Sequence, residues 1–193
     1  MPIVRLAEGE LRDEVRIPVY DTVDIAAGES PIANRQFFTQ VQGRPLSETN
    51  LKQNSLLPTA QSFRVQGLAL DAQNVYDVNA KALPLIMEHS SIVFTVGEKE
   101  YWRGPSRFCA GRIWQHSDQS SLPVHLQQYG KAAVQSVILA GHHVIDINPL
   151  ENFSIDWVTE GMSAAEITDA TPAADTKLRF LFSLKGLFRR PVQ

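Results

Sequence analysis

Five histidines are the residues of this sequence best suited to bind a metal ion: His89, His116, His125, His142 and His143. A metal site needs three or four ligands that converge in space, held by further contacts around them. Because successive side chains of a strand alternate between its faces, at most one of His142 and His143 can point inward. The His-X-His spacing followed by a glutamate, expected of a cupin, is absent. A cupin-like metalloenzyme is therefore kept as an alternative, and we expect these histidines at a strand start, in loops or at a helix end.

Nucleophilic chemistry has equally little support in the residue pattern. The segment RFCAGRIW holds the single cysteine, Cys109, for which a small buried hydrophobic side chain is the more ordinary role. Serine, histidine and aspartate residues are scattered along the chain, but a catalytic triad is defined by geometry and not by such spacing. No nucleotide-binding, zinc-protease, serine-hydrolase or EF-hand motif occurs. We therefore predict a protein that is not an enzyme, with no catalytic, cofactor-binding or metal-ligating residues and no cofactor.

Two further kinds of residue could have a function. Asp21 interrupts a row of apolar residues, which allows a buried carboxylate with a partner, although a strand end or a bulge explains it more simply. Trp102, Trp114 and Trp157 all fall on predicted strands. Aromatic side chains on a β-sandwich can form a platform for a sugar, but core packing or subunit contact is their more common role. A carbohydrate- or receptor-binding β-sandwich is thus a second alternative.

The composition favours one globular domain over residues 1–193. The chain is 44% hydrophobic and 20% charged, which allows a sizeable core, and its net charge is -3. No run of five like charges occurs, so a nucleic-acid-binding tail is not expected. The first residues lack the features of a signal peptide, and the apolar stretch 132–145 is too short and too polar to span a bilayer. A single cysteine cannot form a disulfide within the chain.

The elements that must position any site show a period of two residues. Apolar residues alternate over 15–25, which predicts one long strand or two collinear pieces. The alternation changes phase at Gly67 within 61–71, which predicts a bulge. The closing segment KLRFLFSLKGLFRRPVQ alternates from Lys177 to about Phe188, with the even-numbered row expected in the core. Arg189 and Arg190 are expected to keep the end of this strand soluble.

The remaining segments add short strands, one helix and two long loops. Strands are predicted over 35–41, 91–96, 99–103, 107–115, 142–147 and 152–159, with 132–139 a strand or a short helix. The segment 79–90 is the best helix candidate, with Pro84 in the first turn of a short helix over 85–89. Residues 43–59 and 161–176 read as loops, and we expect them to make contacts with partners.

This pattern predicts an all-β protein. Eight to ten strands at irregular spacing, joined by long connections, are typical of a sandwich in which strands cross between two sheets. We therefore predict a single jelly-roll or Greek-key β-sandwich of about eight strands, with long loops and one short helix.

Four segments carry a resemblance to a known group of proteins: QFFTQVQGRPLSETNLKQNSLLPTAQSFRVQGLAL, SSIVFTVGEKEYWRGP, DINPLENFSIDW and KLRFLFSLKGLFRRPVQ. Together with the strand rhythm, they resemble the jelly-roll capsid proteins of tailless icosahedral bacteriophages, which often contain an internal membrane. The resemblance implies a structural shell subunit that is made in the host cytoplasm and located in the virion. Its implied partners are copies of itself and other virion proteins, and an underlying viral membrane is also compatible. The chain lacks the basic arm of many small coat proteins, so direct nucleic-acid binding is not expected.

Overall fold

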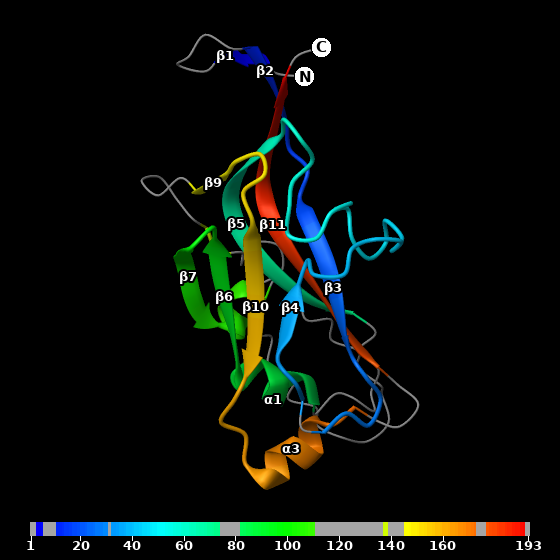
Figure 1. Ribbon diagram of the computed structural model, residues 1–193. Helices are drawn as coiled ribbons and strands as arrows, with labels where there is room; N and C mark the ends of the chain where they lie inside the picture. The colour runs from blue at the N-terminus through cyan, green and yellow to red at the C-terminus, as the bar shows by residue number, and fades with distance from the viewer. Residues whose placement is uncertain are drawn as a thin grey trace, which may run out of the picture.

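In the residues that it describes, the computed structural model is a sandwich of two antiparallel sheets, one of seven strands and one of four (Figure 1). Its described residues are 3–5, 11–30, 32–73, 82–110, 137–138, 145–172 and 177–191. The strands of both sheets contribute to one hydrophobic core in the described part of the chain. The prediction of an all-β sandwich is confirmed.

The larger sheet is built around the last strand. Its members are β1 (Ile3–Arg5), β2 (Leu11–Val15), β3 (Val19–Ile25), β5 (Ser62–Gln73), β8 (Val137–Ile138), β9 (Ile145–Ile147) and β11 (Leu178–Pro191). On one side β11 pairs with β5, and β5 in turn pairs with β8 and β9. On its other side β11 pairs with β2 and β3, and β1 lies outside β2.

The smaller sheet faces it with the order β4-β10-β6-β7. Its strands are β4 (Arg35–Phe37), β6 (Ser90–Val96), β7 (Lys99–Pro105) and β10 (Phe153–Thr159). The predicted hairpin is confirmed, because β6 and β7 pair across a turn in which Gly97 has φ 60°. Glycine adopts this left-handed conformation without the steric cost that a side chain adds.

The closing strand confirms its predicted alternation and corrects its predicted end. Leu178, Phe180, Phe182 and Leu184 are fully buried, and removing each from water contributes about 2 kcal/mol. The strand does not stop at Phe188 but continues to Pro191 in register with β2. Arg189 is not a solvated end: it is 9% exposed, and its Nε lies 2.6 Å from Glu14 Oε1. Polar residues at the strand end are therefore held by cross-strand ion pairs.

The predicted bulge in the larger sheet is confirmed, and it occurs at the same level of β11 as a break between two neighbouring strands. Of the two possibilities left open for 15–25, the structure has the interrupted one: β2 ends at Val15, β3 begins at Val19, and residues 16–18 leave the ladder. On the opposite side, Lys185 pairs with Gly67 but Gly186 pairs with Val65, so Gln66 is the extra residue of a bulge in β5.

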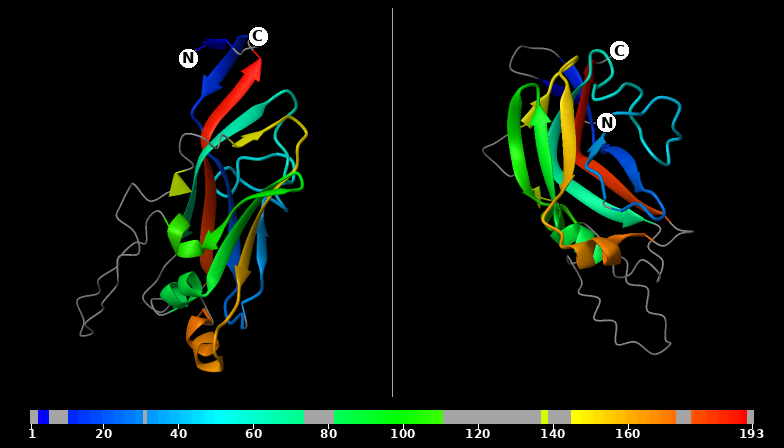
Figure 2. Two further views of the ribbon diagram at one scale, coloured as in Figure 1. Left: turned by 90° about the vertical axis from the view of Figure 1, so that its left-hand side faces the viewer. Right: turned by 60° about the horizontal axis from the view of Figure 1, so that its bottom comes forward.

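Beyond the sandwich body, the ends of the chain form a projection. The strands β1 and β2 and the last residues of β11 extend past the other strands at one end of the molecule (Figure 2, left). Pairing of Arg5 with Leu11 and of Arg12 with Pro191 holds these pieces in one ladder. The described parts of both ends thus lie side by side.

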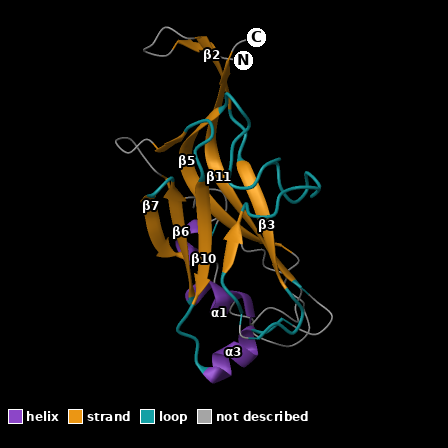
Figure 3. Cartoon of the chain, viewed as in Figure 1, coloured by secondary structure: helices purple, strands orange, loops and turns teal. Residues whose placement is uncertain are grey.

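The described helices are α1 (Ala82–Glu88), α2 (Ser106–Cys109) and α3 (Ala164–Ala170), with α1 and α3 at the end opposite the projection (Figure 3). The helix predicted over 85–89, with Pro84 in its first turn, is confirmed as α1, although α1 begins earlier, at Ala82. The predicted number of helices, one, was too small. The helix α2 occupies the start of the strand that was predicted over 107–115, and α3 lies within the loop predicted over 161–176. The Ser163 hydroxyl accepts from the Glu166 N–H at 3.3 Å and forms a capping box that starts α3. No described helix has the length and apolarity needed to cross a membrane.

Candidate functional site

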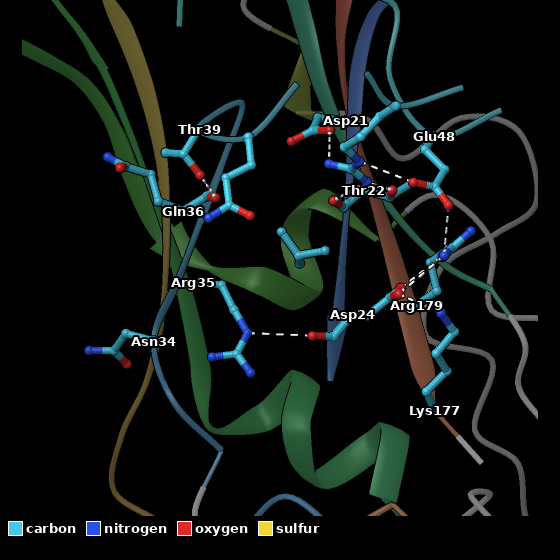
Figure 4. Close-up of a pocket in the computed structure, with 13 residues that line it drawn as sticks. Asp21, Thr22, Asp24, Asn34, Arg35, Gln36, Thr39, Glu48, Lys177 and Arg179 are labelled. Atoms are coloured by element: carbon cyan, nitrogen blue, oxygen red, sulfur yellow. Dashed lines mark hydrogen bonds and ion pairs between the residues drawn. The ribbon is translucent and has the colours of Figure 1, made fainter. Parts of the chain in front are cut away.

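A polar hollow of about 510 Å³ opens where β3, an edge of the larger sheet, faces β4, an edge of the smaller one (Figure 4). We call it the β3–β4 hollow. The amides of Asn34 and Gln36 lie on its β4 side, and Arg35 extends from there toward Asp24. Its charged lining consists of Asp21, Asp24, Arg35, Arg44, Glu48, Lys177 and Arg179.

The charges of the β3–β4 hollow form a chain of alternating sign. Lys177 Nζ and Arg179 Nε each lie 2.7 Å from a carboxylate oxygen of Asp24. The same Arg179 reaches Glu48 at 3.0 Å, and Glu48 pairs with Arg44 at 3.0 Å. Burial acts to raise the pKa of Asp24, but hydrogen bonds from Arg179 and Lys177 outweigh it and leave that pKa below its ordinary value. The ionised carboxylates are therefore stabilised within the chain itself.

Asp21 is the buried end of this chain. It is 1% exposed, and its carboxylate accepts from the Phe38 N–H at 2.6 Å and from Arg44 Nη1 at 2.8 Å. Burial raises the pKa of Asp21 despite these two donors. The simpler sequence explanation was wrong, because β3 is regular here and Asp21 pairs with Phe182 across the core-facing row. The Asp21 carboxylate accepts a hydrogen bond from the backbone N–H of Phe38, a residue with φ 66° at the point where the chain leaves β4.

The predicted loop 43–59 covers the free edge of β3. Asn50 Oδ1 accepts from the Tyr20 N–H at 3.0 Å, and Thr49 Oγ1 donates to the Tyr20 carbonyl at 3.0 Å. Arg44 Nη2 donates to the Thr22 carbonyl at 2.9 Å. A bare edge strand would offer these groups to another chain, so the loop protects β3 from edge-to-edge pairing. The loop nevertheless presents Leu46 to solvent, with 75% of that residue exposed.

The described candidate residues do not assemble a reactive site. Cys109 is buried, which raises the pKa of its thiol to about 12 and leaves it protonated at neutral pH. His89 Nε2 lies 3.2 Å from Glu166 Oε1 and joins α1 to α3. His116, His125, His142 and His143 lie outside the described residues. Within the described part, no group of three or more histidine, cysteine, aspartate or glutamate residues could hold a metal ion.

The two described tryptophans have packing roles. Trp157 is fully buried, and its indole N–H donates to Ser106 Oγ at 3.1 Å. Its ring lies 4.6 Å from that of Phe180, centroid to centroid. Trp102 is half-buried against the same core, and Trp114 lies outside the described residues. Trp157 therefore joins the two sheets, and neither described tryptophan is an exposed platform for a sugar.

Sequence reasoning singled out Asp21 and the 43–59 loop but not the hollow that they share. The missing information is the pairing of distant residues, since Arg179 and Asp24 are 155 positions apart. Asp21 was the one sequence signal for this hollow, because a single carboxylate in an apolar row needs a cation or several hydrogen-bond donors when it is buried.

Comparisons with known proteins add no further assignment. No family model, curated protein or solved structure matches this chain. The resemblance to capsid proteins thus stays an expectation, and function must be inferred from the fold and from the chemistry of the surface.

Proposed function

We propose that this chain is a structural shell subunit of a virion, built on a jelly roll. The pairing of the strands supports this fold. The pairing is nested in chain order: the first strand of the body pairs with the last, the second with the second-last, and so on inward. The pairs are β3 with β11, β4 with β10, β5 with β9, and β6 with β7. This is the pattern of one long hairpin that folds over itself to make two sheets.

The distribution of strands between the sheets agrees with the same fold. We count β2 and β3 as one interrupted strand, β8 and β9 as another, and β1 as an outer addition, which leaves four strands in each sheet among the described residues. Successive strands then alternate between the sheets except at the β6–β7 hairpin. The nested pairing is the observation that carries the proposal, because it distinguishes a jelly roll from a meander or an immunoglobulin-like sandwich.

Jelly rolls include capsid subunits, lectins and cupins, so the surface must decide between them. Trp157 lies in the core and Trp102 packs against it, which weakens the carbohydrate alternative. The charges of the β3–β4 hollow are satisfied by one another, which leaves few of them for a small ligand. A shell subunit needs modest lateral contacts in place of a deep reactive pocket.

The 43–59 loop is the proposed lateral contact with copies of this chain or with other virion proteins. It is anchored to β3 through Thr49 and Asn50, so it loses little conformational freedom when a neighbour binds. Leu46 then supplies an apolar side chain in a fixed position. The segment 161–176 is a second proposed contact, and the described part of it includes the helix α3.

Sedimentation velocity over a range of concentrations, with electron microscopy of the same samples, tests the proposal. We expect large assemblies that Leu46→Asp weakens. The matched control is Leu150→Asp, since Leu150 is 69% exposed on the β9–β10 turn. A chain that stays monomeric at every concentration would contradict the proposal, and equal effects of both variants would remove the loop as the specific contact. Metal analysis of the same preparation tests the metalloenzyme alternative.

A further inference from the structure

A second hollow, of about 450 Å³, lies on the outer face of the larger sheet. We call it the β11 hollow, and its lining includes Arg16, Gln66, Gly67, Ser183, Lys185 and Gly186. It forms where the ladder is irregular on both sides of β11. The break between β2 and β3 lies on one side, and the bulge at Gln66 lies on the other.

Gly186 is required for the floor of this hollow. A Cβ atom at this position would lie 2.0 Å from the carbonyl oxygen of Arg64 and 2.8 Å from Cζ of Phe63. The backbones of β11 and β5 can therefore approach only because position 186 has no side chain. Gly67, the cross-strand partner of Lys185, also contributes no side chain to fill the hollow.

The cations of the β11 hollow lack counter-charges in the described part of the chain. Arg16 and Lys185 are both exposed, and neither forms an ion pair with any described residue. Other arginines of the same sheet are paired: Arg64 with Asp146, Arg179 with Asp24, and Arg189 with Glu14. Among the described residues that line the hollow, none is a carboxylate. A local excess of two positive charges thus occurs in a chain whose net charge is -3.

Neutral donors complete the lining. Ser183 is 7% exposed, and its hydroxyl forms no hydrogen bond with a described residue. The amide of Gln66 is exposed at the bulge. A phosphate group carries up to two negative charges and three strong acceptor oxygens, which matches one guanidinium, one ammonium and these neutral donors.

We propose that the β11 hollow binds a phosphate group. The phosphate belongs either to a free anion or to the headgroup of an anionic lipid. Ile17, which adjoins Arg16 and is 45% exposed, would meet the apolar part of a lipid surface. The site does not depend on assembly of the chain, so it can exist or fail independently of the shell function.

The first arm of the test uses inorganic phosphate and the full chain. Amide NMR shifts are followed during a phosphate titration, with sodium chloride at matched ionic strength as the blank. We expect saturable shifts at Ser183 and Gly186. The affinity for phosphate should fall more than about tenfold in Arg16→Gln/Lys185→Gln, because each substitution removes a hydrogen bond from a charged donor. The control Lys52→Gln/Arg107→Gln removes one lysine and one arginine, both exposed, from elsewhere on the surface.

The second arm uses vesicles of phosphatidylcholine with and without phosphatidic acid. Flotation with anionic vesicles alone, lost in the double variant but not in the control, assigns the site to a lipid headgroup. Saturable phosphate shifts without flotation assign it to a free anion. Absence of both, or equal binding by the double variant and the control, would overturn the proposal. Thermal unfolding of each variant verifies that it is folded.

Discussion

The β3–β4 hollow and the β11 hollow are similar in size but opposite in the state of their charges. The first has a volume of about 510 Å³ and the second about 450 Å³, and both are lined by arginine and lysine. In the first, Asp21, Asp24 and Glu48 balance the cations. In the second, no described lining residue does so. Hollows of similar size can therefore differ in whether their charges are used to hold the fold together or are left without a partner among the described residues.

Their positions explain the difference. The β3–β4 hollow lies at a sheet edge, where the free N–H and C=O groups of β3 need partners. Arg44, Thr49 and Asn50 supply them, and carboxylates keep Arg44 in place. The β11 hollow lies away from the β3 edge, at a level where β11 pairs with β5 on one side and its ladder with β2 and β3 is interrupted on the other. Its polar side chains have no such structural task.

The largest expected effect comes from filling the floor of the β11 hollow. Gly186→Ala forces a Cβ atom against the Arg64 carbonyl, and backbone cannot yield as a side chain can. We expect the free energy of unfolding to fall by more than about 3 kcal/mol, measured by urea denaturation. The control is Gly28→Ala, where φ is 71° but no atom lies within 4 Å. It should cost about 1 kcal/mol, and equal losses would refute the close approach.

The next effect comes from removing the buried carboxylate of the β3–β4 hollow. Asp21→Ala leaves the Phe38 N–H and the guanidinium of Arg44 without their partner. Because Arg44 retains some exposure, we expect a loss of about 2 to 3 kcal/mol in unfolding free energy, together with faster amide exchange over the 43–59 loop. The more exposed Asp156→Ala should change stability by under about 1 kcal/mol. A loop that stays protected from exchange would show that Asp21 does not anchor it.

A smaller effect is expected in the dependence of stability on pH. The pKa of Glu48 is lowered by the hydrogen bond from Arg44 and by the charge of Arg179, and that of Asp24 is lowered as well. These two carboxylates thus bind protons less tightly in the folded protein than in the unfolded chain. They stabilise the fold when the pH is above their ordinary pKa values of 4.5 and 3.8, and this stabilisation is lost as the pH falls below those values. Arg179→Gln should flatten this fall, as measured by denaturation from pH 6 to about 3. The ion pair between Asp21 and Arg44 is present with and without this substitution. An unchanged slope of unfolding free energy against pH would therefore show that the acid sensitivity arises elsewhere.

The smallest effect sharpens the contrast between the hollows. Arg16→Gln/Lys185→Gln should change the unfolding free energy by no more than about 0.5 kcal/mol, since neither cation has an acidic partner in the described part. Arg44→Gln, which breaks contacts to Asp21 and Glu48, should cost clearly more. A large loss in the double variant would mean that the cations of the β11 hollow also stabilise the fold.

Local patterns in the sequence were sufficient to predict much of this fold. Alternation identified the core row of β11 and the bulge beside Gly67, because each depends on nearby side chains, and it left open whether β2 and β3 form one strand or two. The helix α3 was missed although its capping box, Ser163 with Glu166, is visible in the sequence. The short helix and the small residues of this segment gave no period that competed with the loop prediction.

The parts that the sequence could not predict depend on contacts between distant residues. Arg189 was assigned to a soluble end because its partner Glu14 lies 175 positions away. The burial of Asp21 depends on Arg44 and on the conformation of Phe38, which become neighbours only when β3 and β4 meet. Both hollows depend on the order of strands in the sheets, and alternation alone does not specify that order.

Electron cryomicroscopy of the assemblies formed by the purified chain tests the central claim, that this is a shell subunit, most directly. The account predicts a regular lattice or closed particle in which the two-sheet body repeats, with the 43–59 loop at a contact between neighbours. A preparation that contains isolated, folded single chains at every concentration would contradict it.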